Sequence, residues 1–210
     1  MIKHLNKASP ATWLRTGLAA LSLMFFALPL AAAEPAADSA TAAVRAVVDP
    51  VLELLRKPDF DVVKDGADIS ARVKAGFDDT AMAQSVLGNH WRTATPEQRN
   101  EFKALLLQTI EDTYLERLDA YTSETIDFTK EEVRNDRATV FSVVNAAQGK
   151  IPVNYKLRKK DSGWFLYDVE VENVSMVSSY RDTYGAIVSR DGVDGLLTQM
   201  KARTAPEPEV

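Results

Sequence analysis

The spacing of apolar residues changes twice along this chain, from a helical period to alternation after Thr122 and back to a helical period near Val174. In residues 40–57 apolar side chains recur every three or four positions, the period of a helix with one buried face. Residues 68–75 suit a second helix. A third is predicted from Asp78 or Asp79, either of which suits an N-cap, to Leu87.

A longer helix is predicted from Thr95 to about Tyr121. Gly88 suits the end of the preceding helix, because glycine adopts left-handed backbone angles without a steric penalty. Thr95 suits the next N-cap, with Pro96 at the first helical position and Gln98 placed to close a capping box. Apolar residues cover more of this helix than one contact face requires, which indicates burial on two sides or one wall of a cavity.

The second half alternates between apolar and polar residues, which is typical of strands with one buried face. The turn-forming segments Gln148–Gly149 and Lys160–Gly163 predict hairpins. Hairpins between successive strands make an antiparallel meander of about four strands. In the last strand, alternation assigns these residues to one apolar face: Phe165, Tyr167, Val169 and Val171.

A final helical region begins near Val174 and is interrupted between Gly192 and Gly195 before a short last helix. Residues 204–210 are rich in proline and glutamate, so we expect them to be disordered. The order of elements predicts an α+β fold, with residues 34–203 forming a single domain.

The N-terminus has the organisation of a secretory signal peptide. Basic residues precede an apolar run over residues 18–30, and three alanines follow before Glu34. That run is shorter than the roughly 20 residues of a membrane-spanning helix. We therefore predict a signal peptide over residues 1–33, cleavage near Ala33 and an exported product, with an uncleaved anchor as the alternative.

Composition excludes several classes of site and partner. The chain has no cysteine, so disulfides, thiol nucleophiles and cysteine-based zinc sites are absent. Its formal net charge is −5, and residues 1–33 contain basic residues but no acidic one, so the exported part is more acidic still. Acidic chains are repelled by nucleic acids and by anionic membranes, and we expect neither nucleic-acid binding nor stable membrane insertion.

Candidate catalytic chemistry is sparse. His90 is the one histidine outside the predicted signal peptide, which rules out a metal site built on paired histidines. The chain contains no Gly-x-Ser-x-Gly elbow and no phosphate-binding glycine loop. Asp168 is the candidate general acid or base, and its alternative is a cross-strand ion pair with Lys156 or Arg158. We assign no catalytic residue and no metal ligand.

Four segments in the same order resemble the MlaC/toluene-tolerance family of periplasmic phospholipid-binding proteins. They are Phe77–Ala83, Val86–Phe102, Trp164–Asp168, and the C-terminal set formed by Val174–Val177, Tyr180–Arg181 and Gly192–Leu197. The chain departs from the family pattern at Asn173, where the family usually has glycine, and over residues 61–75.

The resemblance implies a cone-like fold of the nuclear transport factor 2 type, in which helices wrap a curved antiparallel sheet around an apolar pocket. It also implies a periplasmic carrier without a cofactor, whose cargo is phospholipid. Its implied partners are an outer-membrane lipoprotein complex and an inner-membrane ABC transporter with its substrate-binding MCE component. Shuttling between these complexes would maintain the lipid asymmetry of the outer membrane.

A carrier of this kind needs apolar side chains around the acyl chains and a polar rim. The predicted pocket residues are Phe102, Leu106, Ile110, Tyr114, Tyr155, Phe165, Tyr167, Val169, Met176 and Tyr180. The predicted rim, for contact with a head group or a partner, comprises Trp91, Arg92 and Arg181. The alternatives are a hopanoid as cargo, a small enzyme on the same scaffold acting on a hydrophobic substrate, and an interaction module with a solid core.

Overall fold

The computed structural model describes residues 38–115 and 124–204, apart from the side chains of Tyr114, Leu115 and Thr204. The predicted signal peptide, the C-terminal end of the long helix and the tail from residue 205 lie outside the described residues. Each hydrogen-bonded strand pair in the sheet is antiparallel, and the order is β1-β2-β3-β4-β5. The strands are β1 Thr125–Arg134, β2 Arg137–Ala146, β3 Gly149–Lys160, β4 Gly163–Val171 and β5 Val174–Ser175.

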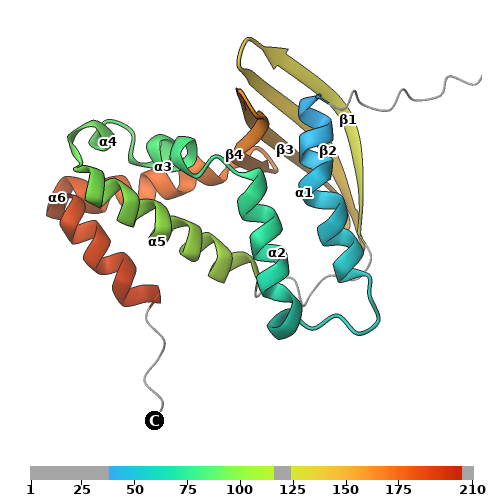
Figure 1. The fold of residues 1–210 in the computed structure, drawn as a ribbon, viewed down its shortest axis with the longest axis horizontal. Helices are drawn as coiled ribbons and strands as arrows, with labels where there is room; N and C mark the ends of the chain where they lie inside the picture. Colours follow the sequence, from blue (N-terminus) through green and yellow to red (C-terminus); the bar gives the residue numbers. More distant parts are fainter. Residues whose placement is uncertain (1–37, 116–123, 205–210) are drawn as a thin grey trace, which may run out of the picture. The chain divides into compact units, whose positions relative to one another are not determined.

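The expected α+β fold and meander are confirmed, and the two-residue strand β5 is added at the edge (Figure 1). Helices α1 to α5 precede the sheet in the chain and α6 follows it. Their bounds are α1 Ala40–Leu55, α2 Val62–Gly76, α3 Asp79–Leu87, α4 His90–Thr93, α5 Pro96–Leu115 and α6 Met176–Thr204. None of the described helices is long and apolar enough to cross a membrane.

Local hydrogen bonds fix several helix ends where the sequence predicts them. The Thr95 N–H donates to Gln98 Oε1 at 2.9 Å and the Gln98 N–H donates to Thr95 Oγ1 at 3.2 Å, which completes the capping box. Gly88 ends α3 with a φ of 56°. Gly192, with a φ of 72°, kinks α6 where the sequence predicts an interruption.

Helix α2 is longer than predicted. It begins at Val62 rather than near residue 68, because the Asp61 carboxylate accepts hydrogen bonds from the N–H groups of Val63 and Lys64. Val63 is 89% exposed, so the first turn of α2 lacks the buried apolar face by which a helix is recognised in a sequence. Helix α1 begins at Ala40 and contains Pro50.

A β-bulge in β4 overturns the predicted face of two residues. Tyr155 is paired with Val169 and Leu157 is paired with Leu166, so Tyr167 has no partner across the ladder. The extra residue shifts the alternation by one position. Leu166 and Val169 therefore share the face of Tyr155, although simple alternation would separate them.

Phe165 and Tyr167 consequently lie on the opposite face of the sheet, where they contact cations. Arg137 lies 5.4 Å from the ring centroid of Tyr167, and Lys160 lies 5.1 Å from that of Phe165. The expectation that both rings lie on the apolar face is wrong.

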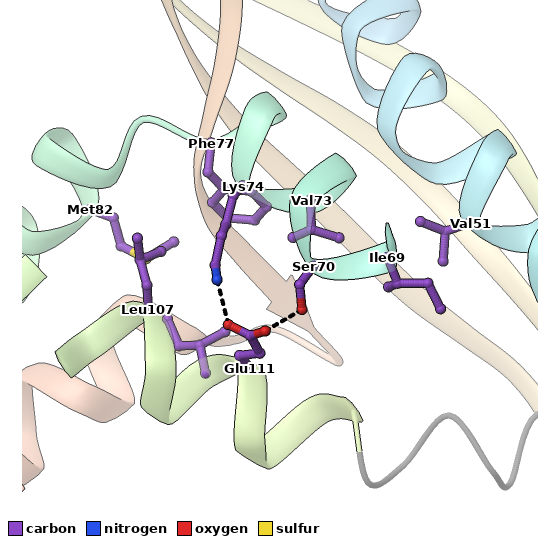
Figure 2. Close-up of a pocket in the computed structure, with 10 residues that line it drawn as sticks. Val51, Ile69, Ser70, Val73, Lys74, Phe77, Met82, Leu107 and Glu111 are labelled. Atoms are coloured by element: carbon purple, nitrogen blue, oxygen red, sulfur yellow. Dashed lines mark hydrogen bonds and ion pairs between the residues drawn. The ribbon is translucent and has the colours of Figure 1, made fainter. Parts of the chain in front are cut away.

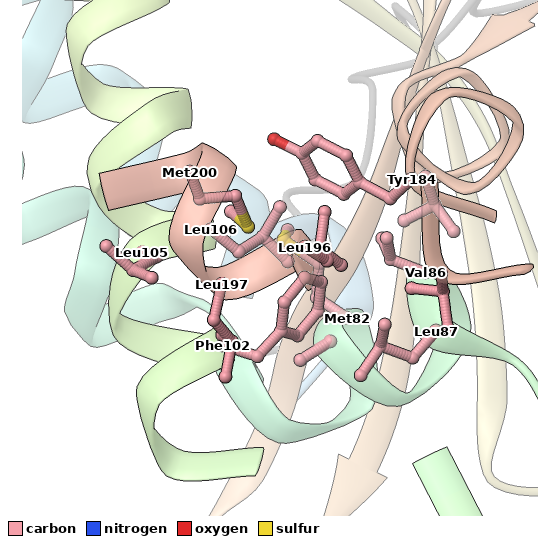
Figure 3. Close-up of a cluster of buried hydrophobic side chains, with 13 residues drawn as sticks. Met82, Val86, Leu87, Phe102, Leu105, Leu106, Tyr184, Leu196, Leu197 and Met200 are labelled. Carbon is pink, nitrogen blue, oxygen red and sulfur yellow. The ribbon is translucent and has the colours of Figure 1, made fainter. Parts of the chain in front are cut away.

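Two clusters of buried side chains form the core. The sheet cluster is covered by α1 and comprises Ala40, Val44, Val47, Ala138, Val140, Val153, Tyr155, Leu157, Trp164 and Leu166. The helix cluster joins α3, α5 and α6 (Figure 3) and comprises Met82, Ala83, Val86, Leu87, Phe102, Leu105, Leu106, Val177, Tyr184, Val188, Leu196, Leu197 and Met200. Phe77 packs against both clusters.

Candidate functional site

Two adjoining cavities lie where the sheet cluster and the helix cluster come together. The smaller, here called the small chamber, has a volume of about 170 Å³. Helices α1, α2, α3 and α5 contribute its walls (Figure 2). Its lining residues are Val51, Ile69, Ser70, Val73, Lys74, Phe77, Met82, Leu107, Ile110 and Glu111.

The second cavity, here called the large chamber, has a volume of about 480 Å³ and reaches the edge of the sheet. Helices α2, α5 and α6 and strands β4 and β5 contribute its walls. Its lining residues are Val73, Phe77, Ile110, Val169, Val171, Val174, Met176, Ser179 and Tyr180. Binding pockets for small ligands span roughly 300–1,000 Å³ and are mostly apolar, and the large chamber meets both criteria.

Three residues line both chambers and form the wall between them: Val73, Phe77 and Ile110. Phe77 is held in place by the backbone. It forms an isolated parallel bridge with Leu166 of β4, and the neighbouring Asp78 N–H donates to the Leu166 carbonyl oxygen at 2.7 Å. The chain between α2 and α3 is thereby fixed to the sheet, and the aromatic ring stands between the two chambers.

A polar cluster formed by Ser70, Lys74 and Glu111 edges the small chamber and connects α2 to α5 (Figure 2). The Lys74 ammonium lies 2.6 Å from Glu111 Oε2, and the Ser70 hydroxyl donates to Glu111 Oε1. Partial burial by itself would raise the pKa of Glu111, but the hydrogen bonds from Lys74 and Ser70 outweigh it and the pKa is lowered. The carboxylate is therefore held in its charged form beside an apolar cavity.

The structure places four of the ten predicted pocket residues on the large chamber: Ile110, Val169, Met176 and Tyr180. Phe102 and Leu106 lie instead in the helix cluster, at 0% and 1% exposure, because their face of α5 packs against α3 and α6. Neither of them lines a chamber.

The remaining predicted pocket residues lie away from the chambers or outside the description. Tyr155 is buried in the sheet cluster, where burial raises the pKa of its phenol. Phe165 and Tyr167 lie on the opposite face of the sheet because of the bulge. The side chain of Tyr114 lies outside the described part of the structure.

Sequence reasoning missed the contribution of α2. Ile69, Val73 and Phe77 are spaced four residues apart, which places them on one helical face and its continuation. Ile69 lines the small chamber and the other two form the dividing wall. The signal was present in the sequence, since the predicted helix over residues 68–75 already contains Ile69 and Val73, but its apolar face was not assigned to the pocket.

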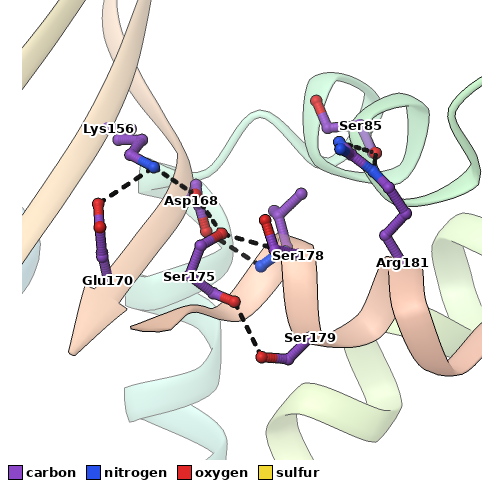
Figure 4. Close-up of polar contacts among 9 residues, drawn as sticks. Ser85, Lys156, Asp168, Glu170, Ser175, Ser178, Ser179 and Arg181 are labelled. Atoms are coloured by element: carbon purple, nitrogen blue, oxygen red, sulfur yellow. Dashed lines mark hydrogen bonds and ion pairs between the residues drawn. The ribbon is translucent and has the colours of Figure 1, made fainter. Parts of the chain in front are cut away.

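The buried Asp168 positions the N-terminus of α6 (Figure 4). Its side chain is 3% exposed and both of its oxygens are occupied. Oδ1 accepts from the Val177 N–H at 3.0 Å, and Oδ2 accepts from Ser175 Oγ at 2.8 Å and from Lys156 Nζ at 3.2 Å. Ser175 Oγ in turn accepts from the Ser178 N–H at 3.0 Å, as a helix N-cap does.

Lys156 is a shared partner in this network, since its Nζ also lies 3.1 Å from Glu170 Oε2. Burial alone would lower the pKa of Lys156, but the hydrogen bonds to Glu170 and Asp168 outweigh it, so the pKa is raised. The expected cross-strand ion pair between Asp168 and Lys156 is thus present. Asp168 lines neither chamber, which favours a structural role over acid–base catalysis.

The three predicted rim residues lie near the C-terminal end of α3 and away from both chambers. Trp91 packs against the helix cluster, with the Arg99 guanidinium 5.3 Å from its ring centroid. Arg92 donates to Asn89 Oδ1 at 2.9 Å and is exposed. Arg181 Nε donates to the Ser85 carbonyl oxygen at 2.7 Å, which satisfies a carbonyl in the last turn of α3. Contact of these residues with a head group or a partner stays a prediction.

Comparison with known proteins identifies the family. The sequence model of the family described as "MlaC protein" matches residues 45–202, which include every residue of both chambers. The chain belongs to the MlaC family. The resemblance drawn from the sequence motifs is therefore confirmed.

In the part of the chain that the structure describes, no group of three acidic, histidine or cysteine side chains is arranged to hold a metal ion.

The proteins similar to this chain include a curated member of the MlaC family and a solved structure. The Intermembrane phospholipid transport system binding protein MlaC of Haemophilus influenzae is 30% identical over 129 residues, which cover 59% of this chain and 60% of that protein. A solved structure of the phospholipid-binding protein from Ralstonia solanacearum, in complex with a phospholipid, matches with a TM-score of 0.73. It is 24% identical and the match covers 79% of this chain and 97% of that one, which shows a shared fold.

Asn173, which departs from the expected family pattern, has an unusual backbone conformation. The residue has a φ of 66°, in the left-handed region where glycine carries no penalty and asparagine is among the best tolerated alternatives. The backbone at Asn173 is thus in a conformation that glycine and asparagine adopt more readily than other residues.

Proposed function

We propose that this protein is a phospholipid carrier that holds acyl chains in the small and large chambers. The observation that carries the proposal is a pair of adjoining, predominantly apolar cavities in a member of the MlaC family. The cargo is the class of molecule bound by the similar protein from Ralstonia solanacearum. A carrier requires no catalytic group and no cofactor beyond its bound lipid.

In the wider proposal, residues 1–33 are a cleaved signal peptide and the protein works in the periplasm. There it exchanges lipid with an outer-membrane lipoprotein complex and with an inner-membrane ABC transporter through the MCE component of that transporter. This traffic maintains the lipid asymmetry of the outer membrane. The name of the Haemophilus influenzae relative, which refers to intermembrane phospholipid transport, and the N-terminal sequence pattern support this assignment.

The energetics of transfer favour a shuttle of this kind. Moving two sixteen-carbon chains out of water stabilises them by about 25 kcal/mol at roughly 0.8 kcal/mol per methylene, beyond the usual range of non-covalent affinity. Transfer from a bilayer replaces one apolar environment with another, so most of this term cancels. The chambers therefore need only match the membrane for loading and unloading to be reversible.

Lipid extraction and mass spectrometry of the purified protein test the proposal. We expect phospholipid to copurify, and we expect the delipidated protein to take phospholipid from vesicles. Ile110→Trp places a larger side chain where the two chambers meet. It should abolish loading, because Ile110 lines both chambers. Gln108→Trp adds the same bulk at an exposed position of α5 and serves as the control.

Two outcomes would contradict the proposal. One is a folded, monodisperse protein that neither copurifies with phospholipid nor accepts it from vesicles. The other is equal loading of the Ile110→Trp and Gln108→Trp variants, which would place the lipid elsewhere on the protein.

A further inference from the structure

Two valines on the wall of the large chamber are exposed to solvent. Val171 is 42% exposed and Val174 is 63% exposed, although both line the cavity. Exposed apolar side chains are common when scattered singly, but these two are cross-strand partners and continue an apolar cavity surface. The large chamber therefore opens to solvent past an apolar lip.

The lip has a fixed geometry. Val171 and Val174 flank a two-residue turn, Glu172–Asn173, in which both residues have positive φ, at 49° and 66°. Such turns match the twist of the strands that they join. Ser175, next to the lip, accepts from the Ser178 N–H and donates to the buried Asp168, so the base of the turn is anchored to the sheet and to α6 (Figure 4).

The small chamber has an edge of opposite character. There the side chains of Lys74 and Glu111 are 48% and 25% exposed, and they lie in contact across the gap between α2 and α5 (Figure 2). An acyl chain that passed between them would separate the two charges and offer neither a new partner. At the valine lip, an acyl chain exchanges contact with membrane lipid for contact with apolar side chains.

We propose that acyl chains enter and leave the protein over the lip formed by Val171 and Val174, with the Lys74–Glu111 ion pair remaining closed. This inference rests on the proposed function and names the route that the cargo takes. The occupant of the lip is the acyl chain of a phospholipid in transit. Because the lip is crossed during both loading and release, a charge placed on it should slow both steps.

The experiment compares charged variants of exposed valines. Val174→Glu places a carboxylate on the lip. Val133→Glu places the same charge at a valine on β1 that is 51% exposed and lines neither chamber. Delipidated protein is mixed with vesicles of phosphatidylethanolamine and phosphatidylglycerol that contain a phospholipid with a pyrene-labelled acyl chain. The initial rate of uptake and the final amount bound are both recorded.

We expect Val174→Glu to slow both uptake and release by about tenfold, which corresponds to about 1.4 kcal/mol in the barrier. Val133→Glu should match the unsubstituted protein in both rate and amount, which removes repulsion by anionic vesicles as the cause. Equal rates for the two variants would overturn the inference, as would a loss of bound lipid in Val174→Glu at an unchanged initial rate. Failure of the unsubstituted protein to load would instead overturn the proposed function.

Discussion

Asp168 is a single buried carboxylate that connects the sheet to a helix. It joins β3, β4 and the start of α6 through Lys156, Ser175 and the Val177 N–H. The charge is compensated by an ammonium group and by the positive end of a helix. Removal of that charge should therefore affect stability first.

We predict that Asp168→Asn lowers the free energy of unfolding by about 3 kcal/mol, because the buried carboxylate then loses its charged hydrogen bonds to Lys156 and to the N-terminus of α6. Ser175→Ala should lower it by about 1 kcal/mol, the usual effect of losing an N-cap. Urea unfolding measures both. Asp136→Asn, whose side chain is 56% exposed beside Arg158, is the control and should change little.

Lipid loading of the Asp168→Asn variant distinguishes a structural role from a catalytic one. Below its unfolding transition, the variant should still bind phospholipid from vesicles, because Asp168 lines neither chamber. Unchanged stability together with complete loss of lipid binding would contradict the structural role.

Glu111 should make stability depend on pH. Its pKa is lowered below the usual 4.5, so its stabilising contribution is complete above that value and is lost as the pH falls through the lower pKa of the folded state. We predict that Glu111→Gln lowers the free energy of unfolding by about 1 kcal/mol near neutral pH and that the difference disappears in acid. Urea unfolding over a pH series tests this, with the exposed Glu53→Gln as the control. A difference that does not vary with pH would contradict it.

At the scale of elements, the sequence predicts best where a local hydrogen bond decides the outcome. The capping box of α5 involves Thr95 and Gln98 alone, so no distant residue is needed to recognise it. The face of Tyr167 was mispredicted because a bulge is defined by pairing with another strand. The alternation of residues along β4 alone does not show how β4 pairs with β3.

The β4–β5 turn offers a test of backbone strain at this scale. Because Asn173 has a φ of 66°, Asn173→Ala should lower the free energy of unfolding by about 1 kcal/mol, whereas Asn173→Gly should stay within about 0.5 kcal/mol of the unsubstituted protein. Asn89→Ala is the control, since Asn89 has a helical φ of −64°. Thermal or urea unfolding measures all three. An alanine variant as stable as the glycine variant would show that the turn is not strained.

At the scale of the whole molecule, the two buried clusters leave space between them that Phe77, Val73 and Ile110 only partly fill. A close-packed interior would be more stable without cargo, since lining atoms beside a void lose contacts. The chambers are therefore expected to make stability depend on bound lipid.

We predict that delipidated protein unfolds at a lower urea concentration than loaded protein, and that phospholipid restores the difference. Stabilisation by ligand reaches about 2.7 kcal/mol when free ligand exceeds its Kd a hundredfold. Ile110→Trp should show no such dependence, because its side chain occupies the wall between the chambers. Identical midpoints for loaded and delipidated protein would contradict the prediction.

Caps, alternation and short motifs depend on residues close together in the chain, so most helices, the meander, the turns and the family are predictable from the sequence. Which apolar residues surround a cavity depends instead on how distant segments pack together. Phe102 and Ile110 lie on the same helix and have similar chemistry, yet one fills the helix cluster and the other faces both chambers. A cavity lining and a solid core share one composition, and the distinction arises from which face of α5 packs against α3 and α6 and which face lies towards α2.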